Sequence, residues 1–284
     1  MTYVKTRDGV DIYVKDWGSG RPVILMHGWP LSADSWDAQS LALADAGYRV
    51  IAYDRRGFGR SGQPWNGYNY DTLSDDLADV MEATGATENV TLVGFSMGGG
   101  EVARYMSRHG GKGVVSAALI ASVVPYMLQT SDNPDGTPQK VFDGIADGIK
   151  EDRARFFHHT FFPQFFDQGL LTQSVSDEVI TAATATALQA GLKPTLACAE
   201  AFATTDFRPD LPHFKVPTLI IHGTSDKTVP IDASARAANK AIPGSTLLEY
   251  DGSPHGLTET DGERLTSDLL SFLSTTSAKA ASWA

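Results

Sequence analysis

The stretch Val90-Thr-Leu-Val-Gly-Phe-Ser-Met-Gly98 decides how this chain is expected to fold. Its first four residues are a short apolar run, which is typical of a strand buried on both faces. The next residues contain the only G-x-S-x-G pattern in the sequence, with Ser96 at its centre, and residues 99–107 have a helical pattern. A strand, a sharp turn and a helix in this order hold the serine hydroxyl in the open above the end of a sheet.

Similar apolar runs recur along the chain and predict a parallel sheet. Two N-terminal segments instead alternate apolar and polar residues around Asp8-Gly9, which predicts an antiparallel hairpin. Helical patterns separate the strands, so we expect an α/β fold with a mostly parallel eight-stranded sheet and helices on both faces. The expected strands are 3–6, 11–17, 22–26, 48–53, 90–93, 114–121, 218–221 and 245–250, and the clearest helices are 71–83, with Asp71 or Thr72 as N-cap, and 257–273.

One long segment breaks the alternation of strands and helices. Residues 125–212 have helical patterns but no convincing strand, and they lie between two expected core strands. We therefore expect a helical cap at 125–212, inserted into a core at 1–124 and 213–275, and a C-terminal tail at 276–284. The cap holds six phenylalanines, of which we expect one or two to face a substrate cavity: Phe156, Phe157, Phe161, Phe162, Phe165 and Phe166.

Composition excludes several classes of protein. The 284 residues carry a formal net charge of −11, which repels nucleic acid and anionic lipid. No long uncharged apolar run predicts a membrane span, and the charged N-terminus has no signal-peptide pattern, so we expect a cytoplasmic protein. The single cysteine, Cys198, rules out an intrachain disulfide and lies in an apolar stretch, so we expect a buried structural thiol.

Ser96 requires a base and an orienting acid if its hydroxyl is to act as a nucleophile. His255 lies in a loop after the last expected strand, and Asp226 lies in a loop beyond the strand 218–221. The carboxyl ends of parallel strands gather at one edge of a sheet, so these three side chains should meet there. We expect the catalytic triad Ser96, Asp226 and His255, with Asp251 as the rival acid.

A tetrahedral intermediate also needs two amide donors. We expect them to be the N–H of Met97, which follows the serine, and the N–H of Trp29, in the loop after the strand 22–26. Trp29, Phe162 and Val229 are the expected substrate contacts. Neither a metal site nor a cofactor is expected, because the G-x-G-x-x-G pattern at 57–62 opens no helix and His158 and His159 lack a third ligand.

Four motifs together resemble one branch of the α/β-hydrolases, the cofactor-free haloperoxidases, which are also called perhydrolases and aryl esterases. The resemblance covers about residues 1–275, and the segment Asp132-Asn-Pro-Asp-Gly is also similar. It implies hydrolysis of small carboxylic esters and reversible formation of peracid from a carboxylic acid and hydrogen peroxide, without metal or haem. The motifs are His27-Gly-Trp-Pro, Asp54-Arg-Arg-Gly-Phe-Gly-Arg-Ser, Gly94-Phe-Ser-Met-Gly-Gly-Gly-Glu and His222-Gly-Thr-Ser-Asp.

In this branch, a proline directly after the oxyanion tryptophan resembles the perhydrolase variant, and here that residue is Pro30. A fixed φ at Pro30 would reposition the Trp29 carbonyl as an acceptor for a peroxide. Two alternatives to an esterase or perhydrolase stay open: a lactam or C–C bond hydrolase, and a non-enzymatic receptor for a small ligand. Haloalkane dehalogenases and epoxide hydrolases carry Asp where this chain has Ser96. A homo-oligomer is possible.

Overall fold

The computed structural model describes residues 3–167 and 174–281, and these contain one eight-stranded sheet. The strand order is β1-β2-β4-β3-β5-β6-β7-β8. β1 and β2 form an antiparallel hairpin and β2 pairs antiparallel with β4, whereas every later pair is parallel. The expected architecture is therefore confirmed. The strands are β1 (Tyr3–Lys5), β2 (Asp11–Gly18), β3 (Pro22–Met26), β4 (Arg49–Tyr53), β5 (Val90–Phe95), β6 (Val114–Ile120), β7 (Thr218–Gly223) and β8 (Thr246–Tyr250).

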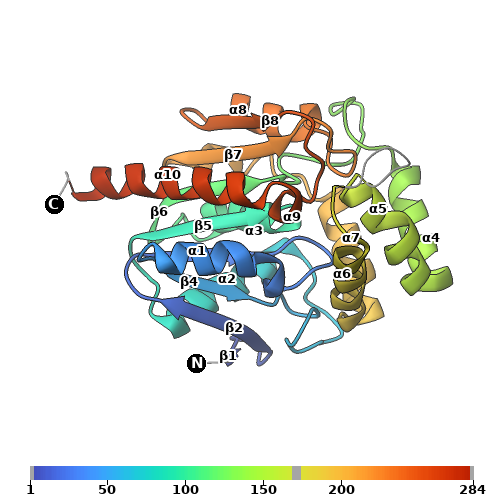
Figure 1. Ribbon diagram of the computed structural model, residues 1–284, viewed down its shortest axis with the longest axis horizontal. Coiled ribbons are helices and arrows are strands. Elements are labelled where there is room, and N and C mark those ends of the chain that lie inside the picture. Colours follow the sequence, from blue (N-terminus) through green and yellow to red (C-terminus); the bar gives the residue numbers. More distant parts are fainter. Residues whose placement is uncertain (1–2, 168–173, 282–284) are drawn as a thin grey trace.

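Helices cover both faces of this sheet. The long C-terminal helix α10 packs beside α1 on the face toward the viewer in Figure 1, and α2 packs against α3 on the other face. Every residue of β5 and of β7 is buried, as expected for strands covered on both sides. The helices are α1 (Asp37–Asp45), α2 (Tyr70–Thr84), α3 (Met97–Arg108), α4 (Gln139–Phe156), α5 (Phe162–Phe165), α6 (Asp177–Gln189), α7 (Leu192–Thr204), α8 (Ala237–Ala241), α9 (Leu257–Thr260) and α10 (Gly262–Ala281).

Two helix ends differ from the sequence prediction. Asn69, rather than Asp71 or Thr72, caps α2, because its side-chain oxygen accepts the Thr72 N–H at 3.0 Å. The last helix is divided between α9 and α10 and continues to Ala281, so the described part of the expected tail is helical. Arg21 contacts the start of this extension, since its guanidinium donates to the Thr276 hydroxyl at 3.2 Å as well as to the Leu273 carbonyl at 2.7 Å.

Helices α4 to α7 follow β6 in the chain and precede β7. Figure 1 shows them together at one end of the molecule, beyond the carboxyl ends of the parallel strands. This position places them over the loops that follow β3, β5 and β7. None of the helices in the described ranges combines the length and apolar character needed to cross a bilayer.

Candidate active site

Ser96 lies at a strained turn between β5 and α3. Its φ of 53° and ψ of −117° put a non-glycine residue in the left-handed half of backbone space, which surrounding packing must hold in place. Small neighbours make the turn possible: a Cβ on Gly94 would collide with the Gly98 backbone, and a Cβ on Gly28 would press on Phe95 and Ser96. The loop after β3 therefore lies directly against the serine.

The structure brings Ser96, His255 and Asp226 into one hydrogen-bonded chain. Nε2 of His255 lies 2.9 Å from Oγ of Ser96, and Nδ1 of His255 lies 2.6 Å from Oδ2 of Asp226. All three residues are buried. The rival acid Asp251 is exposed and accepts from Thr224 instead. A proton on Nδ1, shared with the carboxylate, leaves Nε2 free to accept the serine hydroxyl proton.

The surroundings of Asp226 favour the ionised form of its carboxylate. Its Oδ1 accepts the backbone N–H groups of Thr228 and Val229 at 2.9 and 2.8 Å. Burial opposes the charge, but the electrostatic interaction with His255 and hydrogen bonds from His222 and His255 together hold the pKa of Asp226 below its usual range. Asp226 can therefore orient His255 and stabilise its cation at neutral pH.

The loop after β3 presents the Trp29 N–H through a fixed peptide plane. The Gly28 carbonyl accepts the Leu31 N–H at 2.9 Å and faces Nδ1 of His27 at 2.9 Å. Nε2 of His27 accepts a hydrogen bond from the backbone N–H of Arg55 at 2.9 Å. The proton of His27 is therefore on Nδ1, which donates it to the Gly28 carbonyl. Because this carbonyl and the Trp29 N–H share one rigid plane, fixing one fixes the other.

A buried ion pair, not anticipated from the sequence, supports this loop. The guanidinium of Arg55 donates to the His27 carbonyl at 2.6 Å and to Glu101 at 2.5 Å. Tyr53 donates its hydroxyl to the same carboxylate at 2.6 Å. Since Glu101 lies on α3, the pair joins the loop to the helix that begins after Ser96. Burial and the charge of Arg55 hold the pKa of His27 well below its usual range, so this imidazole is neutral.

An apolar pocket of about 130 Å³ opens at Ser96 and His255. Trp29 and Val229, two of the three expected substrate contacts, are among the residues that line it. Phe162 does not: its side chain is fully buried and packs against Phe157 and Phe166. Adjacent helical residues point in different directions, so Phe161 takes the position in the pocket that was expected of Phe162. Phe156 also lines the pocket.

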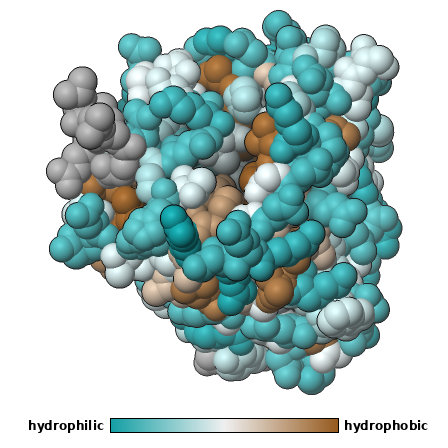
Figure 2. Space-filling model, turned by 90° about the vertical axis from the view of Figure 1, so that its right-hand side faces the viewer, coloured by the Kyte–Doolittle hydropathy of each residue, from teal (hydrophilic) through white to brown (hydrophobic). Residues whose placement is uncertain are grey.

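An outer groove of about 440 Å³ lies between α4 and α7. Phe142, Ile145 and Phe202 line both this groove and the pocket at Ser96, so they form a wall between the two spaces. Figure 2 looks onto the side of the molecule that carries α4–α7 and shows apolar patches among hydrophilic side chains there. We call Phe142, Ile145 and Phe202 the dividing wall.

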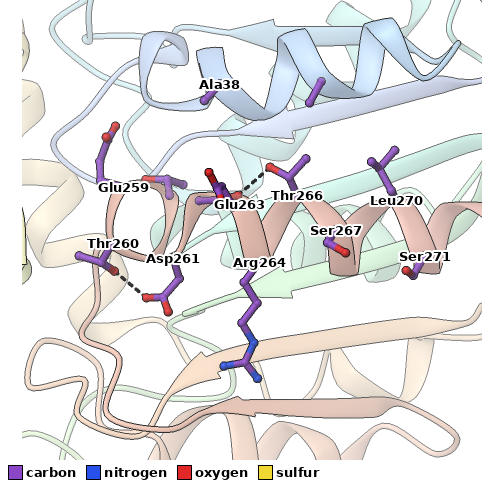
Figure 3. A pocket seen from close by; sticks show the side chains of 13 residues that line it. Ala38, Glu259, Thr260, Asp261, Glu263, Arg264, Thr266, Ser267, Leu270 and Ser271 are labelled. Carbon is purple, nitrogen blue, oxygen red and sulfur yellow. Dashed lines mark hydrogen bonds between the residues drawn. The ribbon is translucent and has the colours of Figure 1, made fainter.

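A larger depression lies elsewhere, between α1 and the start of α10 (Figure 3). It is lined mainly by polar side chains and includes no member of the Ser96–His255–Asp226 chain. Arg264 is among the lining residues drawn in Figure 3, and its guanidinium carbon lies 3.7 Å from the centre of the Tyr250 ring. Although this depression is larger than the pocket at Ser96, it is therefore not the candidate active site.

Two other sequence expectations are resolved by the structure. Cys198 is a buried free thiol, and burial raises its pKa to about 12, so it is no nucleophile. The glycine-rich segment 57–62 closes on itself through a hydrogen bond from the Gly57 N–H to the Gly62 carbonyl at 2.9 Å. The next helix, α2, begins only at Tyr70, so the segment has no helix N-terminus to offer a pyrophosphate.

The fold and this site define an α/β-hydrolase. A model of the alpha/beta hydrolase fold family matches residues 21–261, and the chain belongs to this family. It is 44% identical over 278 residues to a non-heme chloroperoxidase of Kitasatospora aureofaciens, covering 96% of this chain and 99% of that protein. It is 41% identical to a bifunctional esterase/perhydrolase of Acinetobacter calcoaceticus, with 96% and 99% covered.

The solved structures agree with these relatives. A bromoperoxidase from Bacillus anthracis matches with a TM-score of 0.92 and 45% identity, covering 96% of this chain and 99% of that chain. Within the α/β-hydrolase family, the chain therefore belongs to the non-heme haloperoxidase branch, as the sequence motifs indicated.

Proposed function

We propose that this protein is a serine hydrolase that acts on small carboxylic esters through an acyl-enzyme and also forms peracids. The observation that carries the proposal is the hydrogen-bonded triad of Ser96, His255 and Asp226, which lies at a small apolar pocket. Similarity to a bifunctional esterase/perhydrolase and to non-heme chloroperoxidases supports both activities.

Each residue has a defined role in this mechanism. Ser96 attacks the acyl carbon while His255 takes its proton and then gives it to the leaving group. The N–H groups of Trp29 and Met97 donate hydrogen bonds to the developing oxyanion. Neither N–H has a protein acceptor within residues 3–167 and 174–281, so both are available for this role. Water then attacks the acyl-enzyme, and His255 returns the proton to Ser96.

Peracid formation uses the same intermediate. A carboxylic acid acylates Ser96 with loss of water, and hydrogen peroxide attacks the acyl carbon in place of water. The products are the peracid and free Ser96, so no electrons leave the substrates and no metal or haem is required. The released peracid oxidises halide outside the site.

Pro30 sets the balance between the two reactions in this proposal. Its ring fixes φ and so directs the Trp29 carbonyl, which no group of the described residues donates to. A carbonyl held at the pocket can accept a hydrogen bond from hydrogen peroxide. Pro30→Leu should lower the rate of peracetate formation relative to p-nitrophenyl acetate hydrolysis; an unchanged ratio would refute this role.

The proposed activity is tested by comparing wild type with Ser96→Ala. Wild type should hydrolyse p-nitrophenyl acetate and form peracetate, and Ser96→Ala should lose both. Ser116→Ala is a matched control, because it removes a buried hydroxyl whose hydrogen-bond partner among the described residues is Thr91, remote from the triad. No turnover by wild type would instead indicate a receptor, and turnover of lactams but not esters would indicate the other hydrolase class.

The compartment and the assembly state are further proposals. A single buried cysteine suits a reducing compartment, so we place the protein in the cytoplasm. A homo-oligomer stays a prediction.

A further inference from the structure

A second histidine contacts the acid of the triad. His222 lies in β7, and its side chain is fully buried. Nε2 of His222 lies 3.1 Å from Oδ2 of Asp226 and 2.8 Å from the Val229 carbonyl. In the sequence, His222 is the first residue of the motif His222-Gly-Thr-Ser-Asp, which ends at Asp226.

The position of the proton on His222 follows from these neighbours. A carbonyl oxygen and an ionised carboxylate can only accept, so Nε2 must carry the hydrogen, which it donates to the Val229 carbonyl and shares with Oδ2 of Asp226 at 3.1 Å. Within the described ranges, Nδ1 of His222 has no hydrogen-bond partner. The neutral Nε2–H form therefore accounts for the two contacts without a second proton.

We propose that His222 is a positioning residue that holds Asp226 for catalysis. This inference rests on the proposed function of the triad. Oδ1 of Asp226 is held by two backbone N–H groups, and Oδ2 receives hydrogen bonds from His222 and His255. With both oxygens held, the carboxylate cannot rotate, and the lone pair of Oδ2 stays directed at Nδ1 of His255.

His222 also connects the acid to the substrate pocket. The Val229 carbonyl accepts from the same N–H, and the Val229 side chain lines the pocket. One imidazole therefore sets the loop 226–229 at both ends, and the triad acid and this part of the pocket wall move together.

Two polar substitutions separate this role from simple packing. Glutamine can place an amide N–H near the position of Nε2, whereas the shorter asparagine cannot reach Asp226. A hydrogen bond to a charged group is usually worth enough to change a rate about 10- to 100-fold. His222→Asn should therefore lower kcat for p-nitrophenyl acetate by about 10- to 100-fold with KM within about twofold, and His222→Gln should recover most of the loss.

A suitable control removes an equivalent bond next to β7. Tyr250, at the end of β8, donates its hydroxyl to the carboxylate of Asp268 at 2.6 Å, away from the triad. Tyr250→Phe should leave kcat and KM unchanged. Equal losses in His222→Gln and His222→Asn, or no loss in either, would overturn the proposal.

Proton NMR gives a second readout that does not need turnover. The 2.6 Å contact between His255 and Asp226 should give a strongly deshielded Nδ1 proton in wild type. That resonance should persist in His222→Gln and move upfield or vanish in His222→Asn. If it is identical in all three proteins, His222 does not position Asp226, whatever the enzyme turns out to hydrolyse.

Discussion

The dividing wall should set the length of the acyl group that this enzyme accepts. Phe142 lies on α4, is only partly buried, and separates the pocket of about 130 Å³ from the outer groove of about 440 Å³. Phe142→Ala should join the two spaces. Because the side chain is not fully buried, we expect a stability cost of about 2 kcal/mol, below the usual range for a core phenylalanine.

The gain for long substrates can be worked out from apolar burial. Three methylenes that enter the groove would contribute about 2.4 kcal/mol. Ordering the longer chain costs about 1 kcal/mol. The difference between these two free energies corresponds to roughly a tenfold rise in kcat/KM for p-nitrophenyl octanoate relative to p-nitrophenyl acetate.

The assay is the ratio of kcat/KM for these two esters. Leu196→Ala is the matched control, because Leu196 lines the groove but not the pocket. It should leave the ratio within about twofold of wild type. If Phe142→Ala also leaves the ratio unchanged while the protein stays folded, the wall does not limit chain length and the reasoning fails.

Three further outcomes follow from the site. Asp226→Asn should lower kcat about 10⁴-fold, because an amide favours the wrong tautomer of His255; a loss below tenfold in steady-state kinetics would contradict the assigned acid. The folded-state pKa of Asp226 is below its unfolded value, so its ionised form stabilises the fold at neutral pH and this contribution is lost as the pH falls below about 4. The Tm of wild type should thus fall more steeply between pH 5 and 3 than that of Asp226→Asn, and parallel curves would argue against the shift. Glu101→Leu leaves Arg55 buried without its carboxylate and should cost about 3–5 kcal/mol in urea unfolding. The double variant Arg55→Met/Glu101→Leu should regain most of that stability but keep a lowered kcat, because the His27 carbonyl loses its donor; full recovery of kcat would show that the pair does not support the loop after β3.

The sheet could be predicted because the N-terminal strands alternate apolar and polar residues, the parallel strands are local apolar runs, and parallel pairing brings their carboxyl ends together. The same reasoning placed Ser96, Asp226 and His255 at one edge. The cap of α2 was harder, since Asn69, Asp71 and Thr72 are all good N-cap residues and only backbone geometry separates them.

Other features depend on contacts that no local pattern contains. Phe157–Phe161 form a π-helical turn, which adds a residue to the turn and changes which phenylalanine faces the pocket. Phe161 could therefore not be told from Phe162 by helical periodicity. Arg55 and Glu101 are 46 residues apart in sequence, and their pairing depends on how β4 and α3 pack.

The most direct test of the account is a crystal structure of the protein inactivated by a serine-reactive phosphonate. The account predicts a covalent bond from phosphorus to Oγ of Ser96, with the phosphonyl oxygen within hydrogen-bond distance of the N–H groups of Trp29 and Met97. The organic substituent should lie in the pocket bounded by Val229 and Phe161. An adduct on another residue, or a phosphonyl oxygen directed away from both N–H groups, would contradict the proposed mechanism.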